Sequence, residues 1–183
     1  MLGGSFHGQT HSLLANGRIP FYSGDGNLLH FLFDLTGGSV VAALVSAVNE
    51  SIWEHLKLLF YPMITFALAE YFFWGKNREC FWQIKGLGIL LGLVLIPVVY
   101  YTTNGIFGKS ADWLNIALFF LVAAASFWTE TKLFERNGKC TGKGILPAIV
   151  ILGVAILFTV FTFAPPRIPL FLDPMTGTYG FQG

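Results

Sequence analysis

Residues 49–74 read NESIWEHLKLLFYPMITFALAEYFFW. The charged segment, residues 49–57, leads directly into an apolar run, and a bilayer takes about 20 residues of helix to cross. Ionisable side chains at membrane depth cost roughly 2.5–3.5 kcal/mol each on insertion scales, so they usually face a bundle interior and serve a function there. This stretch therefore predicts a membrane helix whose first turns carry candidate functional residues.

The composition of the whole chain agrees with a membrane protein. Of 183 residues, 54% are hydrophobic and only 11% are charged, whereas a soluble domain carries about 25% charged residues. A net charge of +1 excludes the extended basic face of a nucleic-acid binder. We expect the lipid bilayer to be the main partner, with no nucleic acid.

The apolar pattern predicts an all-α, polytopic helical membrane bundle. Residues 27–48 form a broken apolar stretch, interrupted by Asp34 and by Gly37-Gly38. We expect a partial first span there, followed by a short re-entrant or interfacial helix at about 40–48, because irregular backbone at that depth must be covered by protein or water. Four further runs predict full spans, at about residues 54–74, 83–103, 113–131 and 144–163.

The two ends of the chain differ from the spans. Residues 1–26 are polar and glycine-rich, which predicts a flexible segment without a cleavable signal peptide. The rest, 27–183, is expected to be one helical membrane domain. Its tail, 164–183, contains prolines that end the last helix; the tail either covers a polar pocket or only stabilises the end of the bundle.

Basic residues predict the orientation in the cell membrane. They gather in the loops at 75–85 and 132–143, and such loops stay in the cytoplasm. The charged segment and the C-terminus are then outside. Cys80 and Cys140 fall in these same loops, where thiols stay reduced, so we expect both to be inert.

The charged segment allows three interpretations. On a helix, Glu50, Glu54 and Lys57 share one face, while His55 points about 100° away from Glu54. The acids could complement the helix start and pair with Lys57, or the cluster could bind an ion or polar solute. Alternatively, carboxylates and histidines could bind a divalent metal or perform acid–base chemistry, although no His-Glu-x-x-His motif is present. The candidate residues are Glu50, Glu54, His55, Lys57, His30, Asp34 and Asp173 for the polar site, and Glu54, His55 and His30 for a metal.

Two further acids, Glu70 and Glu130, lie near the expected cytoplasmic ends of their spans. The local sequence predicts that they pair with Lys76 or Lys132 at the interface. They are also candidates for the inner half of a proton or ion path that starts at Glu54.

Three segments together resemble a small bacterial family of multi-pass membrane proteins of unknown function. They are LLHFLFD at 28–34, SAVNESIWEHLKLLFYP at 46–62 and FAPPRIPLFLDPMTGTYG at 163–180. The resemblance covers roughly residues 27–181 and implies a compact helical fold of about five spans, with no assigned activity. In the family, a full apolar helix leads into the first segment, whereas residues 1–26 here are polar.

The function expected from the sequence is therefore the binding of an ion or small polar solute for transport, at a polar site that faces outward. A membrane-embedded metal-dependent hydrolase or transferase, with a carboxylate as general base, is the alternative. A structural or partner subunit with no catalytic role is the third class.

Overall fold

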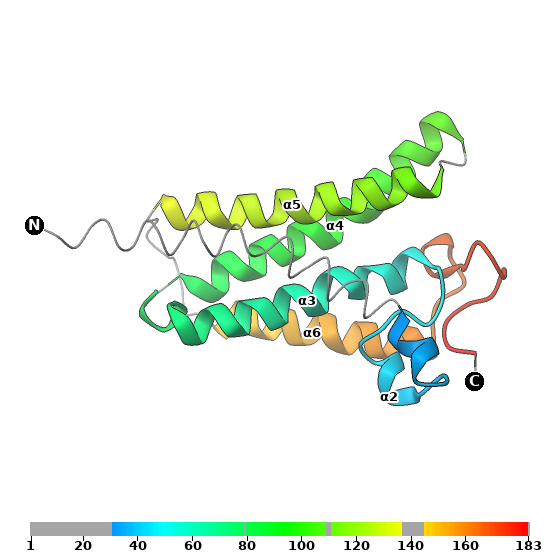
Figure 1. The fold of residues 1–183 in the computed structure, drawn as a ribbon, viewed down its shortest axis with the longest axis horizontal. Coiled ribbons are helices and arrows are strands. Elements are labelled where there is room, and N and C mark those ends of the chain that lie inside the picture. Colours follow the sequence, from blue (N-terminus) through cyan, green and yellow to red (C-terminus); the bar gives the residue numbers. More distant parts are fainter. Residues whose placement is uncertain (1–30, 79, 109–110, 137–144, 183) are drawn as a thin grey trace, which may run out of the picture.

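The computed structural model describes residues 31–78, 80–108, 111–136 and 145–182, and in these parts the chain is α-helical without a β-sheet. The four long helices run side by side (Figure 1). All four are long and apolar enough to span a membrane, which confirms the predicted all-α bundle and its four full spans. They are α3 (Ile52–Phe73), α4 (Phe81–Phe107), α5 (Asp112–Glu135) and α6 (Ile145–Phe163).

The bundle has two distinct ends. At the tail end, α3 begins, α6 finishes and the C-terminal tail packs (Figure 1). At the turn end, α3 and α4 are joined through the short helix η1 (Gly75–Asn77), and α5 finishes. The side of the membrane that each end faces stays a prediction.

Two glycines let α4 approach its neighbours closely. A Cβ atom on Gly88 would lie 2.5 Å from the Glu130 side chain, and one on Gly92 would lie 2.5 Å from Leu59 and 2.8 Å from the Ser126 hydroxyl. Small residues four apart on one helix face are typical of tightly packed membrane helices. The spacing of these glycines is therefore what brings α4 against both α3 and α5.

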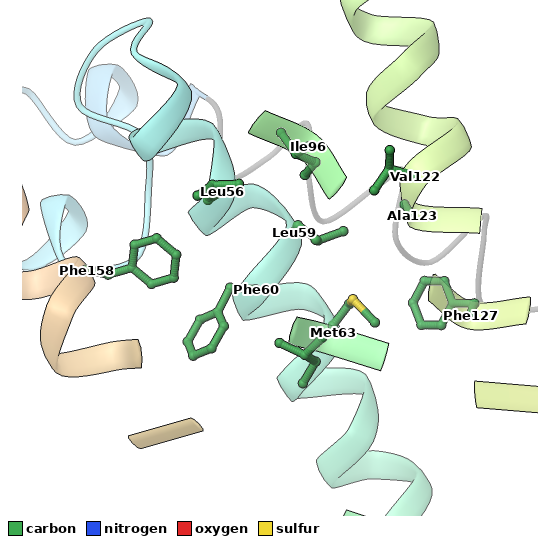
Figure 2. Packing of buried hydrophobic residues seen from close by; sticks show 10 residues of the cluster. Leu56, Leu59, Phe60, Met63, Ile96, Val122, Ala123, Phe127 and Phe158 are labelled. Carbon is green, nitrogen blue, oxygen red and sulfur yellow. The ribbon is translucent and has the colours of Figure 1, made fainter. Parts of the chain in front are cut away.

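An apolar core fills the middle of the bundle. Leu59, Phe60 and Met63 of α3 are buried against residues of the other three spans (Figure 2). This core separates the polar groups of the tail end from those of the turn end.

The segment before α3 is broken, as the glycine pair predicts. Residues 31–35 are helical, and Gly37 and Gly38 then adopt φ values of 65° and 78°, which favour glycine because a Cβ atom is strained there. The short helix expected at 40–48 is shorter than predicted, since α2 covers only Val40–Ala43. At and just beyond the end of α2, the carbonyl groups of Ala43 and Ser46 accept hydrogen bonds from a lysine side chain, described below.

The C-terminal tail folds back over the tail end of the bundle. It contains the short helix η2 (Pro169–Phe171) and a single bridge between Leu172 and Tyr179. The ring of Phe171 lies 4.9 Å from that of Trp53 in α3. The irregular tail is thus held to α3 by aromatic packing.

The expectation that both cysteines are reduced is wrong for Cys80, which is disulfide-bonded. The sequence contains one other cysteine, Cys140, and it lies outside the described residues.

Candidate functional site

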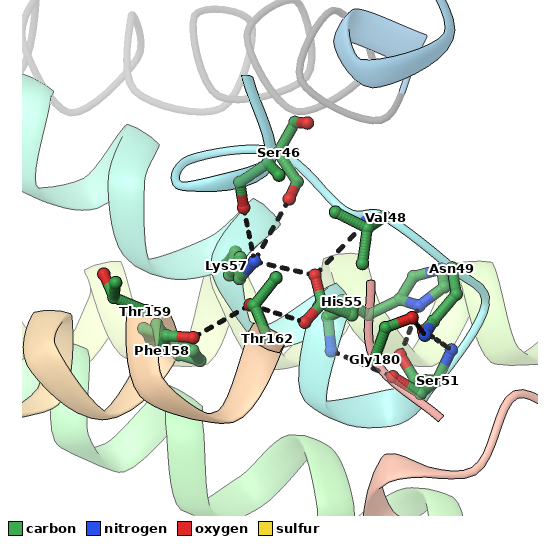
Figure 3. Close-up of polar contacts among 12 residues, drawn as sticks. Ser46, Val48, Asn49, Ser51, His55, Lys57, Phe158, Thr159, Thr162 and Gly180 are labelled. Carbon is green, nitrogen blue, oxygen red and sulfur yellow. Dashed lines mark hydrogen bonds and ion pairs between the residues drawn. The ribbon is translucent and has the colours of Figure 1, made fainter. Parts of the chain in front are cut away.

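The start of α3 is fixed by the polar residues that precede it. The Ser51 hydroxyl accepts a hydrogen bond from the Glu54 amide at 3.3 Å, which is an N-cap. The Asn49 side chain accepts from the Ser51 amide at 2.9 Å and donates to the Gly180 carbonyl at 3.1 Å. One asparagine therefore joins the helix start to the C-terminal tail (Figure 3).

Glu54 and Lys57 form a buried ion pair at the tail end. The Lys57 ammonium lies 2.7 Å from Glu54 Oε2, and the two side chains are 0% and 1% exposed respectively. The Thr162 hydroxyl donates to Glu54 Oε1 at 2.9 Å, and the Val48 amide donates to Oε2 at 3.2 Å. Both carboxylate oxygens of Glu54 are therefore occupied, by groups from α3, α6 and the broken segment.

Lys57 also completes the hydrogen bonding of the broken segment. Its ammonium donates to the Ala43 carbonyl at 2.9 Å and to the Ser46 carbonyl at 3.3 Å. An ammonium has three donors, so all three are used (Figure 3). Backbone carbonyls at membrane depth need a partner inside the protein, and Lys57 supplies it where α2 ends.

Glu50 and His55 form a second, more exposed contact. The nearest oxygen of Glu50 lies 3.5 Å from His55 Nε2, and the side chains are 47% and 32% exposed. The His55 Nδ1 lies 2.9 Å from the Ser51 carbonyl and donates to it, because a carbonyl oxygen only accepts. Glu50 therefore faces His55 and the surroundings of the bundle end, and not Lys57.

A polar hollow opens beside Glu50. It has a volume of about 100 Å³, and Asp34, Asn49 and Glu50 supply its polar walls. Asp34 and Glu50, which lie on either side of the glycine break in the sequence, thus line the same hollow. Its remaining walls are Phe31, Phe33, Ala47 and Val48.

Asp173, another predicted site residue, does not line this hollow. Asp173 is 3% exposed, and its carboxylate accepts from the Met175 amide at 2.8 Å and from the Thr176 hydroxyl at 2.8 Å. It therefore stabilises a turn within the tail. His30 lies outside the described residues.

The metal candidates do not converge within the part of the chain that the structure describes. No group of three His, Cys, Asp or Glu side chains there is arranged to hold a metal ion. Glu54 forms an ion pair with Lys57, whereas His55 contacts Glu50.

The turn end holds a second buried cluster, and it corrects the predicted partners of Glu70 and Glu130. Both carboxylates contact the ammonium of Lys85, with Glu130 at 2.6 Å, and the three side chains are each 1% exposed. Lys132 instead pairs with Glu135 at 2.8 Å on the surface. The local prediction failed because Lys85 lies within α4, while the sequence analysis assigned it to a loop.

Aromatic rings enclose the Lys85 ammonium. It lies 5.8 Å from the ring centres of Phe66, Phe81 and Phe134, within the range of cation–π attraction. Gly88 leaves the space that the Glu130 side chain occupies. A lysine beside glycines in an otherwise apolar run was the signal in the sequence for this cluster.

Comparison with known proteins places the chain in a family. No match was found among curated proteins, and none among solved structures. A family model, however, matches residues 11–181, which is nearly the whole chain. The chain therefore belongs to DUF6512, a family of unknown function.

Proposed function

We propose that this protein binds an ion or small polar solute in the hollow lined by Asp34, Asn49 and Glu50, and that the hollow faces outward. The observation that carries the proposal is that two acidic residues, Asp34 and Glu50, line the same hollow. Two carboxylates favour an occupant with positive charge.

The buried pair is not part of the binding surface in this proposal. Glu54 and Lys57 use their polar atoms on each other, on the backbone and on Thr162. A ligand would have to displace these bonds, and truncating one partner of a buried pair costs about 3–5 kcal/mol. The pair instead holds Val48, beside the hollow, in position through its amide.

The proposal is tested by measuring thermal unfolding of the detergent-purified protein with Na⁺, K⁺, Mg²⁺, Ca²⁺ or ethanolamine at constant ionic strength. We expect one of these cations to raise the melting temperature saturably. The rise should disappear in Asp34→Asn/Glu50→Gln and persist in Glu135→Gln, which removes an exposed acid at the other end. An equal response of the double variant and the wild type would overturn the proposal.

We extend the proposal from binding to transport of the bound ion or solute across the membrane. A route from the hollow toward Glu70 and Glu130 has to pass the apolar core around Phe60 and Met63. Carriage of the bound solute therefore requires movement of the spans. Flux into liposomes that contain wild type or Asp34→Asn/Glu50→Gln separates transport from binding, since a protein that only binds gives no flux.

A structural or partner subunit is the second candidate, and closed ion pairs favour it. Glu54–Lys57 and Glu70–Lys85–Glu130 each join several elements of the bundle. The metal-dependent hydrolase or transferase has no comparable support in the described residues. Loss of a partner protein from the membrane in a deletion strain, with no effect on cation binding, would support the structural role.

A further inference from the structure

The last described residues of the chain, 180–182, which we call the strap, pack against the turn of α6 that binds Glu54. Thr162 in this turn is 0% exposed, and its hydroxyl donates to Glu54 Oε1 at 2.9 Å. The Thr162 carbonyl accepts from the Phe181 amide at 2.8 Å, and a Cβ atom on Gly180 would lie 2.6 Å from the same carbonyl. The strap is therefore in direct contact with a residue that holds the buried carboxylate.

The strap is also bonded to the segment that precedes α3. The Asn49 side chain donates to the Gly180 carbonyl at 3.1 Å (Figure 3), and the ring centre of Phe181 lies 5.8 Å from that of Phe33. The strap thus joins α6 to the broken segment. These two parts of the chain also supply the hydrogen-bond donors to Glu54 that lie outside α3.

The strap is held by fewer contacts than the rest of the tail. The tail before it is fixed by η2 and by the packing of Phe171 on Trp53. Among the described residues, the hydrogen bonds that join the strap to the chain before the tail are those with Asn49 and Thr162. A chain end held by few hydrogen bonds opens locally without unfolding of the core. Gly180, with a φ of 63°, begins the strap, and glycine lets the backbone rotate there.

From these contacts we infer that the strap is a lid over the Glu54–Lys57 pair, and that it opens by rotation at Gly180 while the bundle stays folded. In the closed state Glu54 is 1% and Lys57 is 0% exposed, so solutes do not reach them. In the open state the Glu54 carboxylate is accessible to water and small solutes at the tail end. The inference goes beyond the proposed function, because it concerns the buried pair and holds whether or not the hollow has an occupant.

The test measures the reaction of Glu54 with a water-soluble carbodiimide and glycine ethyl ester in the detergent-purified full chain. The reagents convert the carboxylates that they reach into amides, which peptide mass spectrometry assigns to single residues; an amide formed with Lys57 counts equally as reaction of Glu54. Two acids serve as internal standards, because Glu50 is 47% exposed and should react quickly, whereas Glu70 is 1% exposed and should stay unreacted. We expect Glu54 of the wild type to react slowly, at a rate between these two.

Gly180→Ala/Phe181→Ala displaces the strap, because the added methyl group meets the Thr162 carbonyl and the aromatic contacts of the strap are lost. We expect Glu54 to react severalfold faster in this variant, with the buried standard still unreacted. The matched control is Gln182→Ala, since the Gln182 side chain donates to a carbonyl within the tail. Glu54 should react at the wild-type rate in this control.

Equal rates for Glu54 in the strap variant and the wild type overturn the inference, as does reaction of Glu54 as fast as that of Glu50 in the wild type. A parallel rise at Glu70 also overturns it, because the strap is then part of the global fold and not a separate lid. Hydrogen exchange in the wild type gives a second readout that needs no variant. The Phe181 amide is expected to exchange faster than the Leu59 amide in the core, and equal protection of the two contradicts the inference.

Discussion

At the residue scale, the acids of the charged segment have different roles. Glu54 is buried and faces Lys57 and Thr162, whereas Glu50 is exposed and lines the polar hollow. The two are four residues apart, but only Glu54 lies within α3. The N-cap of the helix, Ser51, comes between them. The same short segment therefore supplies both a buried ion-pair residue, Glu54, and a candidate binding residue, Glu50.

Lys57→Met keeps an unbranched side chain of nearly the same length and removes its charge. The substitution leaves Glu54 buried without its cation and two carbonyls without their donor, so we expect a loss of about 3–5 kcal/mol of stability. Unfolding in detergent by a denaturant measures it.

The matched control is Lys132→Met, which breaks the exposed pair with Glu135. Exposed pairs contribute about 0–1 kcal/mol, so this variant should unfold close to wild type. Similar losses of stability in the two variants would show that the buried pair contributes no more to stability than the exposed pair.

At the element scale, the close packing of α4 depends on glycine. Gly92→Ala places a methyl group against Leu59 and the Ser126 hydroxyl, and overpacking of this kind costs about 1–3 kcal/mol. Gly153→Ala in α6 meets no atom within 4 Å, and alanine favours helix over glycine by about 1 kcal/mol. Melting temperatures should therefore fall for the first variant and stay level or rise for the second; the reverse order contradicts the packing described.

The tail depends on one glycine in the same way. Gly180 has a φ of 63°, and a Cβ atom there would lie 2.6 Å from the Thr162 carbonyl, which accepts from the Phe181 amide at 2.8 Å. Gly180→Ala should loosen the tail, measured as faster hydrogen exchange at the Phe181 amide. Gly177→Ala has a similar φ of 71° but no close contact, so it should disturb that amide less.

Local signals predicted the elements better than their contacts. Hydropathy located the four spans, and the pair Gly37-Gly38 located the break. The i, i+3 spacing of Glu54 and Lys57 made their pairing accessible to sequence reasoning. The Lys85 cluster and the bonds of Thr162 were missed, because partners on different spans leave no mark in local spacing.

At the scale of the whole molecule, two signals give opposite orientations. The basic residues near the turn end place it in the cytoplasm, whereas the disulfide-bonded Cys80 at that end is typical of an oxidising compartment. Labelling intact cells with an impermeant maleimide decides between them. We expect Met175→Cys, exposed in the tail, to be labelled, and Glu135→Cys at the turn end to be labelled only after permeabilisation.

The opposite labelling pattern would show that the protein has the reverse orientation in the membrane. The hollow would then face the cytoplasm, and the disulfide would lie outside. The parent protein serves as the control for labelling of the native cysteines.

Glu54 and Glu50 thus have separate roles: Glu54 stabilises the bundle through its buried ion pair, whereas Glu50 lines the proposed site. The most direct measurement compares the melting temperatures of Glu54→Gln and Glu50→Gln with and without the stabilising cation. We predict that Glu54→Gln melts well below wild type without ligand, and that Glu50→Gln melts near wild type but gains less from the ligand. Full ligand stabilisation of Glu50→Gln, together with a wild-type melting temperature for Glu54→Gln, would contradict this division of roles.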